Sequence, residues 1–452
     1  MELLNRFFRF GERDTNLRTE ILAGVTTFMA MSYIIFVQPV ILSIAGMPKG
    51  GVFFATCVAS AFACLLMGLL ANYPIALAPA MGHNAFFAII VCGTAAQGGM
   101  GFSWEQALAA VFIGGAVFTV LSFFGVRAAI MQFIPNTLKR AIAGGIGLLI
   151  TLIGLEYAGL VVNHSQTLVT FGDLNNRHVL LAIFGLTVTL ILLARDVRGA
   201  LLYGIGATAL LGSLLTALGF PMLKFELQSY GSLNPADTVL KLDFAGLFSQ
   251  KGFIGVVLTF LFLDVFDTVG TLVGVSERAG LLDENGKLPR ARWALFSDAT
   301  GTVVGSLLGT STITSYVESA AGVQAGGKTG LANVVTAALF IISLVLYPIL
   351  GVVSSGVGPQ HSLYPVIAPA LIVVGAMMLK SMAGIAWEDP TELLPAFLTL
   401  IIIPLAVSIT EGIAIGFIAY SVLKLATGRW REVHWGFHLV SAALLLRYIF
   451  LT

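Results

Sequence analysis

The chain has 452 residues, of which 57% are hydrophobic and only 10% are charged, and its formal net charge is +1. About a quarter of the residues in a soluble domain are charged, so this composition excludes a soluble globular protein. The balanced charge gives no sign of a nucleic-acid partner. Many apolar runs reach the roughly 20 residues that cross a bilayer, which predicts an all-α polytopic membrane protein.

Residues 1–20 combine four arginines with leucine and phenylalanine, which predicts a cytoplasmic or interfacial segment before the first span. Seven apolar spans follow, at 21–45, 51–71, 83–97, 104–126, 138–158, 178–194 and 199–219. A polar loop at 220–250, expected to be extracytoplasmic, precedes seven more, at 251–275, 293–309, 316–325, 330–353, 363–381, 393–409 and 410–427. The apolar stretch 433–451 remains, and we expect it to form a terminal helix against the bundle or the membrane interface.

The Lys and Arg residues are unevenly divided between the two sides of these spans. With a cytoplasmic N-terminus, 18 of the 24 fall inside and 5 outside, and Arg447 lies in the terminal stretch. Because cytoplasmic loops of membrane proteins are enriched in Lys and Arg, this division supports both the fourteen spans and the orientation. We predict a multi-pass protein of the plasma (inner) membrane.

Two spans, the third of each half, contain signals that interrupt a helix. Residues 73–87 include Pro74 and Pro79, and residues 305–322 include a run rich in Ser and Thr. Both predict short extended strands followed by short helices. An odd number of spans per half requires the halves to be inverted relative to each other, and broken spans at matching repeat positions indicate the central site of a transporter.

Carboxylates lie at membrane depth beside these segments. Asp264 and Asp267 share one helix face with Thr271 in the eighth span, and Glu318 opens the tenth. Ionisable residues inside a membrane are costly, so they mark a functional site by default. Either aspartate could instead only bind a hydroxyl of a neighbouring helix. The pair Asp267 and Glu318 favours a site whose carboxylates accept N–H groups from a ligand or carry a proton.

The first broken segment supplies further candidates. Asn84 offers a donor and an acceptor, as recognition of a heterocycle edge requires, although it could equally cap the short third helix. His83 could titrate, although a lone histidine in an apolar segment is more often a packing residue. Phe86 and Phe87 could stack on an aromatic ligand, although a phenylalanine in such a chain more often faces the lipid or packs in the core.

Several long motifs, in order, resemble those of one known family. They occupy residues 23–37, 78–87, 266–275, 316–322 and 326–331. In these residues the chain resembles the nucleobase–cation symporters of the xanthine/uracil permease superfamily, in particular the AzgA-like branch for adenine, guanine and hypoxanthine. The resemblance implies 14 transmembrane segments in two inverted seven-segment repeats. It implies a core domain at 21–126 and 251–353, a gate domain at 127–219 and 354–428, and leaves a C-terminal helix at 429–452 outside the scheme.

The resemblance also implies site residues. The family's acids match Asp267, by the Val-Gly register, and Glu318, and Asp264 matches a further acidic position, so either aspartate could contact the base. The predicted substrate-binding residues are Asn84, Phe86, Asp264, Asp267, Tyr316 and Glu318. Proton coupling is expected at Asp267 and Glu318. His83, which stands where the branch usually has an apolar residue, and Thr271 are candidates for tuning substrate choice or coupling.

The expected function is proton-coupled import of purine bases by alternating access. We expect no enzymatic activity, no metal site and no catalytic residue, and no cofactor other than the co-transported proton. The expected partners are a purine base and the lipid bilayer, and the sequence leaves a homodimer open. The alternatives are a transporter of another nucleobase, such as xanthine or uracil, and an anion exchanger of the same fold.

Overall fold

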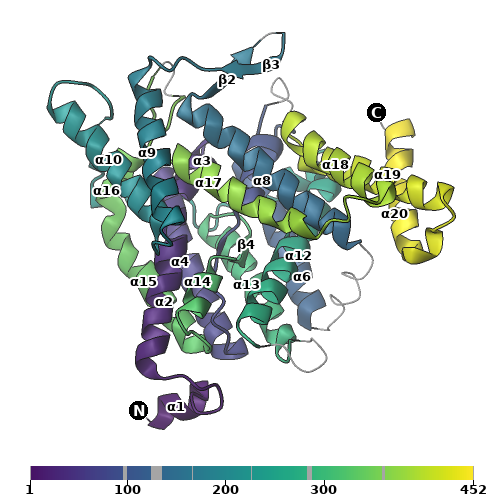
Figure 1. The fold of residues 1–452 in the computed structure, drawn as a ribbon, viewed down its shortest axis with the longest axis horizontal. Coiled ribbons are helices and arrows are strands. Elements are labelled where there is room, and N and C mark those ends of the chain that lie inside the picture. Colours follow the sequence, from purple (N-terminus) through teal and green to yellow (C-terminus); the bar gives the residue numbers. More distant parts are fainter. Residues whose placement is uncertain are drawn as a thin grey trace. The chain divides into compact units, whose positions relative to one another are not determined.

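The computed structural model describes residues 2–94, 99–123, 135–164, 166–224, 227–281, 288–358 and 362–450 (Figure 1). The helices of the first half are α1 (Glu2–Phe8), α2 (Leu17–Met31), α3 (Ile34–Ser43), α4 (Lys49–Leu66), α5 (Met81–Ala85), α6 (Trp104–Phe123), α8 (Asn136–Ala158), α9 (Arg177–Ala194) and α10 (Ala200–Ala217). Two π-helical turns extend them, η1 (Met67–Ala71) after α4 and η2 (Phe86–Val91) after α5.

The helices of the second half are α11 (Phe244–Ser249), α12 (Phe253–Arg278), α13 (Ala291–Leu308), α14 (Ser319–Gln324), α15 (Gly330–Ile342), α16 (Tyr347–Val353), α17 (Ala368–Met378), α18 (Pro390–Leu405), α19 (Ile409–Ala426) and α20 (Trp435–Phe450). The strands are β1 (Leu77–Pro79), β2 (Val161–His164), β3 (Leu168–Phe171) and β4 (Ile313–Ser315). Each predicted span overlaps at least one of these helices. By length and composition, eight of the described helices could cross a membrane.

The chain divides into two compact units. The first unit comprises Met1–Phe124 and Glu156–Ala370, and the second comprises Gly125–Leu155 and Leu371–Thr452. Both aspartates of α12, Glu318 and the two broken segments belong to the first unit.

The broken segments meet in the interior of the first unit. Strands β1 and β4 pair in an antiparallel ladder, with Leu77 opposite Ser315 and Pro79 opposite Ile313. A short helix follows each strand, α5 after β1 and α14 after β4. Gly309, with φ +100°, ends α13 in the left-handed conformation that glycine adopts without strain, and so frees the chain to enter β4. The prediction of short strands in the third and tenth segments is confirmed.

Helix α15 packs closely on its neighbours because glycines line the contact. A Cβ atom added to Gly330 would collide with the carbonyl oxygen of Gly68 in η1. The Thr336 hydroxyl donates a hydrogen bond of 3.0 Å to the carbonyl oxygen of Gly24 in α2. Small residues allow this backbone approach, which supplies packing energy between helices in a membrane.

The predicted first span, 21–45, is divided into two helices. Asn16 caps the start of α2 by accepting from the Thr19 N–H, as asparagine does at helix N-termini. Helix α2 then ends at Met31, and α3 starts at Ile34. The intervening Tyr33 is 1% exposed and points into the first unit.

The polar loop at 220–250 is held on the end of α13. The Thr238 hydroxyl donates to the Leu308 carbonyl oxygen at 2.9 Å, and the Leu240 N–H donates to Leu307 at 2.7 Å. These bonds satisfy carbonyl groups that the end of a helix leaves without partners.

In the second unit, α18 and α19 are neighbours, and α20 packs on α19 (Figure 1). A Cβ atom on Gly416 would collide with the Thr399 hydroxyl, so the two helices approach closely. The buried Phe437 ring of α20 lies 4.8 Å from Phe417 and 5.7 Å from Tyr420 between ring centroids. The apolar stretch 433–451 therefore contributes a helix that packs against another helix, as expected.

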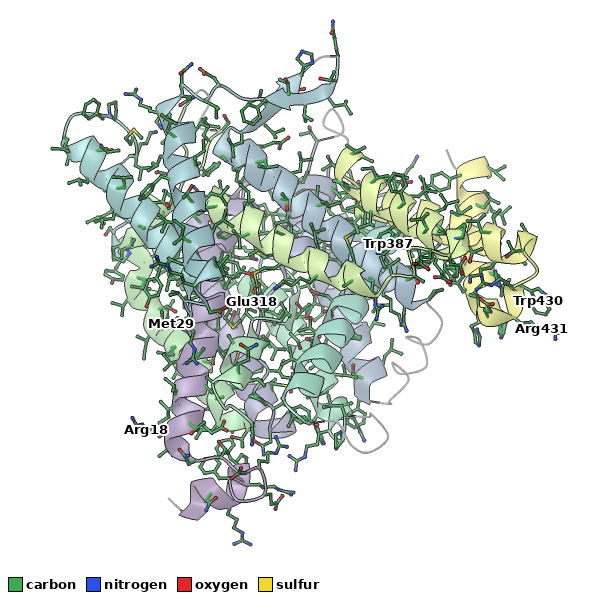
Figure 2. The ribbon with its side chains drawn as sticks, in the orientation of Figure 1. Arg18, Met29, Glu318, Trp387, Trp430 and Arg431 are labelled. Atoms are coloured by element: carbon green, nitrogen blue, oxygen red, sulfur yellow. The ribbon has the colours of Figure 1, made fainter. Side chains whose placement is uncertain are left out.

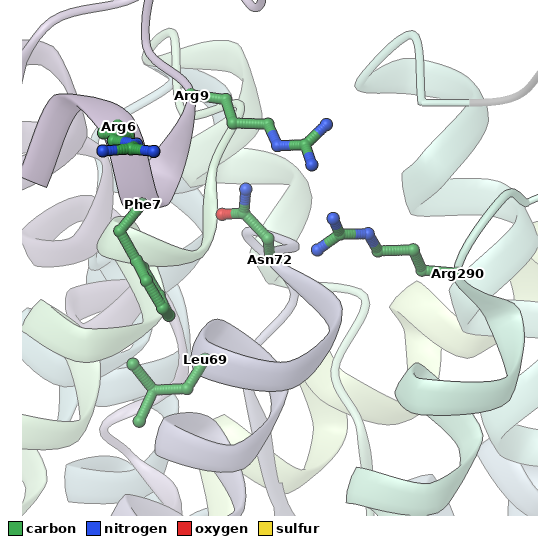
Figure 3. A pocket seen from close by; sticks show the side chains of 6 residues that line it. All are labelled: Arg6, Phe7, Arg9, Leu69, Asn72 and Arg290. Atoms are coloured by element: carbon green, nitrogen blue, oxygen red, sulfur yellow. The ribbon is translucent and has the colours of Figure 1, made fainter.

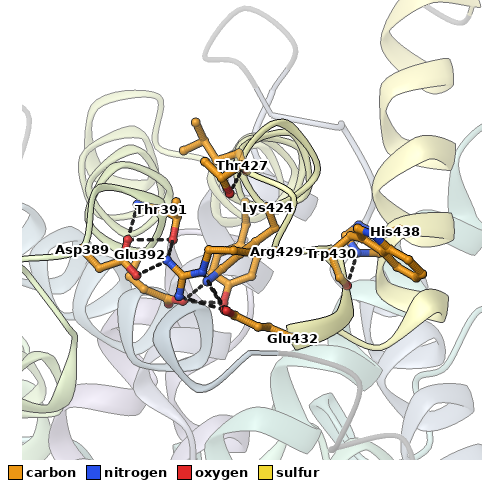
Figure 4. A network of polar contacts seen from close by, with 11 residues as sticks. Asp389, Thr391, Glu392, Lys424, Thr427, Arg429, Trp430, Glu432 and His438 are labelled. Carbon is orange, nitrogen blue, oxygen red and sulfur yellow. Dashed lines mark hydrogen bonds and ion pairs between the residues drawn. The ribbon is translucent and has the colours of Figure 1, made fainter.

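A polar network fixes the start of α18, the end of α19 and the turn before α20 (Figure 4). The buried Lys424 ammonium lies 2.8 Å from both Glu392 and Glu432. Arg429 pairs with Asp389 and Glu432, each at 2.7 Å. Hydrogen bonds from Arg429 lower the pKa of Asp389 to about 2, and those from Arg429 and Lys424 lower the pKa of Glu432 to about 2.

Candidate functional site

The two aspartates of α12 differ in exposure although one helical turn separates them. Asp264 is buried, with 2% exposure. The Asp267 side chain is 38% exposed, and its Oδ2 accepts a hydrogen bond of 3.1 Å from the Thr314 hydroxyl of β4. Of the two, Asp267 is thus the carboxylate that lies beside the strand pair and is open to a ligand.

Glu318 lies directly after β4 and precedes the first residue of α14. The Tyr33 hydroxyl, from the break between α2 and α3, donates a hydrogen bond of 2.9 Å to Glu318 Oε1. In Figure 2, Glu318 lies toward the end of α2 that carries Met29 and away from the Arg18 end. Glu318 is partly exposed, so one strand places two accessible carboxylates, Asp267 beside it and Glu318 after it.

His83 approaches Asp267 from the other broken segment. Its Nδ1 lies 4.0 Å from Asp267 Oδ2, and the imidazole is only 2% exposed. The Nε2 atom is buried without a hydrogen-bond partner in the described part of the chain. The structure thus brings His83, Asp267 and Thr314 together from α5, α12 and β4.

Asn84 is fully buried and belongs to an amide pair with Gln38 of α3. Gln38 Nε2 donates to Asn84 Oδ1 at 3.0 Å, and Asn84 Nδ2 donates back to Gln38 Oε1. The Ser311 hydroxyl also donates to Asn84 Oδ1, and Gln38 Nε2 donates to Thr310 at 2.9 Å. This network joins α3 and α5 to the residues before β4 and fixes the orientation of the Asn84 amide.

The remaining predicted residues lie around this centre. Tyr316 is buried, and its hydroxyl donates to the Pro79 carbonyl oxygen at 2.5 Å, so it ties β1 to the chain after β4. Phe86 is fully buried, with its ring centroid 5.0 Å from that of Phe260, so stacking of a ligand on Phe86 requires the ring to move. Thr271 is partly exposed on α12, one turn beyond Asp267.

Three polar residues of this region were missed in the sequence. Tyr33 and Gln38 lie in the first span, where a buried tyrosine and glutamine are a weaker signal than a carboxylate. Asp298 of α13 is fully buried and accepts from Thr268 at 2.7 Å and from Ser315 of β4 at 3.3 Å. Asp298 lies inside the predicted span 293–309, and an acidic residue within an apolar span is the same signal that singled out Asp264.

A helical bundle whose two broken segments pair as strands beside intramembrane carboxylates defines a multi-pass membrane transporter. The transmembrane domain of the cyanobacterial bicarbonate transporter BicA shares the fold, with a TM-score of 0.62 at 13% identity over 90% of this chain and 97% of that one. The murine anion transporter Slc26a9 matches with a TM-score of 0.61 at 11% identity, over 91% of this chain and 69% of that one.

A family model described as the permease family, Xan_ur_permease, matches residues 18–415, and the chain belongs to that family. MJ0326 of Methanocaldococcus jannaschii is 48% identical over 452 residues, covering 100% of this chain and 99% of that one. The guanine/hypoxanthine permease PbuG of Bacillus subtilis is 44% identical (99% and 100% covered), and the adenine permease AdeP of Escherichia coli is 41% identical (99% and 96%). The chain is therefore a permease and not an enzyme.

Proposed function

We propose that this permease imports purine nucleobases, of the adenine, guanine and hypoxanthine class, together with protons. The observation that carries the proposal is the pair of accessible carboxylates, Asp267 and Glu318, placed by β4 in the interior of a permease. Relatives at 41% and 44% identity that are named for adenine and for guanine/hypoxanthine support the choice of purine.

In the proposed complex, Glu318 and Asp267 accept N–H groups of the base. Adenine, guanine and hypoxanthine each present more than one N–H donor, and carboxylate oxygens can accept hydrogen bonds from these donors. Asn84, held by Gln38, and the strand backbone pair with other edges, and Phe86 stacks after its ring turns from Phe260. Asp264, which is buried one turn away, supports Asp267 from within the bundle.

Proton uptake on Asp267 or Glu318 neutralises the loaded site. An ionised carboxylate at the bilayer centre costs about 2.5–3.5 kcal/mol on the scale of membrane insertion, so neutralisation lowers the barrier to movement of the loaded domain. His83, 4.0 Å from Asp267, is the proposed tuning residue for this step, with Thr271 on the same face of α12.

Movement follows the proposed architecture of fourteen crossings in two inverted repeats. The core domain, residues 21–126 and 251–353, carries the base, and the gate domain, residues 127–219 and 354–428, alternates its access to the two sides. We place the N-terminus in the cytoplasm and the protein in the plasma (inner) membrane because Lys and Arg are enriched on that side. A homodimer is the oligomer to test.

Uptake of radiolabelled hypoxanthine by cells that lack their own purine permeases tests the function. We expect Glu318→Gln to abolish pH-dependent uptake, because the amide cannot carry the proton and accepts one N–H fewer. Glu388→Gln, which changes an exposed glutamate outside the broken segments, is the matched control and should leave uptake unchanged. Undiminished, pH-dependent uptake by Glu318→Gln would refute the assigned role.

The rival function is anion exchange on the same fold. An anion site would place a cation or helix N-termini at the centre. The broken segments, residues 73–87 and 305–322, contain no Lys or Arg, and the second contains the acid Glu318. Thermal stabilisation of the purified protein by hypoxanthine, adenine, guanine, uracil and sulfate separates the two, because stabilisation by sulfate alone would favour the anion exchanger and by uracil alone a different base.

A further inference from the structure

A cavity of about 470 Å³ lies beside α1 and the end of η1 (Figure 3). It is lined by Arg6, Phe7, Arg9, Leu69, Asn72 and Arg290. The lining thus combines three guanidinium groups with two large apolar side chains. The function proposed above uses none of these residues.

Among the described residues, the lining of this cavity contains three guanidinium groups and no carboxylate. In Figure 3 the guanidinium groups of Arg9 and Arg290 both extend toward the space beside Asn72. Arg9 forms an exposed ion pair of 3.3 Å with Glu12, whereas the side chains of Arg6 and Arg290 form no hydrogen bond or ion pair within the described ranges. Guanidinium groups that lie close together repel one another, so an anion bound between them would be stabilised.

The charged groups next to this lining that the structure describes already have hydrogen-bond partners. Arg13, four residues after Arg9, donates to the carbonyl oxygens of Asn72, at 2.9 Å, and Lys328, at 2.6 Å. Burial and the charge of Arg290 lower the pKa of Arg13, while Tyr73 and Glu20 oppose that shift. Glu20 accepts from the backbone N–H groups of Lys328 and Thr329, at 2.9 and 3.2 Å. Within the described ranges, the lining therefore keeps a net positive charge.

The apolar part of the lining is open to the surroundings. Phe7 is 53% exposed and Leu69 is 45% exposed, whereas Phe8 and Phe10 of the same segment are buried and pack with Leu331 of α15. Asn72 Nδ2 donates to the Phe8 carbonyl oxygen at 3.1 Å, which fixes the end of α1 on η1. Helix α1 is thus anchored through Phe8, whereas its Phe7 side chain is exposed.

We propose that this cavity binds the headgroup of an anionic phospholipid. The phosphate lies between Arg6, Arg9 and Arg290, because guanidinium groups form strong, often bidentate hydrogen bonds with phosphate oxygens. The acyl chains run along Phe7 and Leu69. A free phosphate would use the arginines but gain nothing from the exposed apolar side chains, which is why the lipid is the favoured source.

The test uses the full chain, purified in detergent and titrated with dioleoyl phosphatidylglycerol, dioleoyl phosphatidylcholine or inorganic phosphate, with the thermal midpoint as the readout. We expect phosphatidylglycerol alone to raise the midpoint. Arg290→Gln and, separately, Arg6→Gln should each raise the half-saturating concentration of phosphatidylglycerol about fivefold, as expected for the loss of one arginine at an anionic surface. Arg195→Gln, which removes an equal charge from an exposed site elsewhere, is the matched control.

Three results would overturn the proposal. Equal stabilisation by phosphatidylcholine would show that the headgroup charge is not recognised. Equal protection by inorganic phosphate, with the same dependence on Arg290 and Arg6, would assign the site to a free anion. If the phosphatidylglycerol titration were unchanged in both variants, the lipid would not bind in this cavity. Arg6→Gln lies on an exposed helix surface and should fold even if Arg290→Gln does not.

Discussion

Replacing Gln38 by leucine removes one side of the buried amide pair that orients Asn84. In the variant, Asn84 Nδ2 loses its oxygen acceptor and Asn84 Oδ1 keeps only the Ser311 hydroxyl. A buried donor left without a partner costs about 1–3 kcal/mol. We therefore expect Gln38→Leu to lower the free energy of unfolding by about 2 kcal/mol and to weaken uptake through the freed Asn84 amide.

The pairwise part of this effect can be isolated with Asn84→Leu and the double variant. Hydrogen bonds between helices in membrane proteins average about 0.6 kcal/mol and reach about 1.7 kcal/mol in such cycles. Two reciprocal bonds join Gln38 and Asn84, so the coupling energy should be about 1–2 kcal/mol. The double variant should then be more stable than the sum of the two single changes allows.

Equilibrium unfolding of the four proteins in mixed micelles, with rising fractions of denaturing detergent, measures this coupling. Gln324→Leu is the matched control, since Gln324 is exposed at the end of α14, and it should change stability by less than about 0.5 kcal/mol. A coupling energy within about 0.3 kcal/mol of zero would refute the reasoning, because independent sites add to that accuracy.

Two further predictions concern packing and pH. Gly330→Ala should destabilise the protein by about 1–3 kcal/mol or more, because its Cβ meets the Gly68 backbone, whereas Gly206→Ala, where the added atom meets open space, should be neutral or slightly stabilising in thermal unfolding. The pKa of Asp389 is lowered from 3.8 to about 2 by its partners in the folded protein. The ionised carboxylate therefore contributes stability that is present above pH 3.8 and is lost as the pH falls through about 2. Arg429→Gln removes the main cause of that shift, so its thermal midpoint should fall less than that of the parent protein between pH 5 and pH 2, and parallel curves would contradict this.

The strands and short helices of the broken segments could be predicted because local residues specify them. Pro79 excludes a continuous helix, and the Ser and Thr residues before Tyr316 favour extended backbone. Glu318 and Asp267 could be named because a carboxylate in an apolar span is rare and costly. The resemblance to known permeases then supplied the substrate class, which the residues alone leave open.

Other features depend on contacts between distant residues and leave little local signal. The break after α2 contains no Gly or Pro, so the apolar pattern of 21–45 runs through it unchanged. Tyr33 meets Glu318 across 285 residues, and Gln38 meets Asn84 across 46. The two aspartates of α12 differ in burial because different neighbours pack on each. Helical spacing alone cannot predict that Asp264 is buried and that Asp267 is partly exposed.

The ladder of β1 and β4 has a consequence for biosynthesis. The Pro79 carbonyl oxygen accepts a hydrogen bond from the hydroxyl of Tyr316, which follows 237 residues later in the chain. At about 5–20 residues per second, a ribosome needs about 12–50 s to supply that partner. Lipid offers no substitute hydrogen bonds, so the first broken segment must remain in a polar or protein-lined environment during this interval. The first half of this permease should therefore be retained at the insertion machinery until the second half arrives, and a chain truncated before β4 should be a preferred target for membrane proteases.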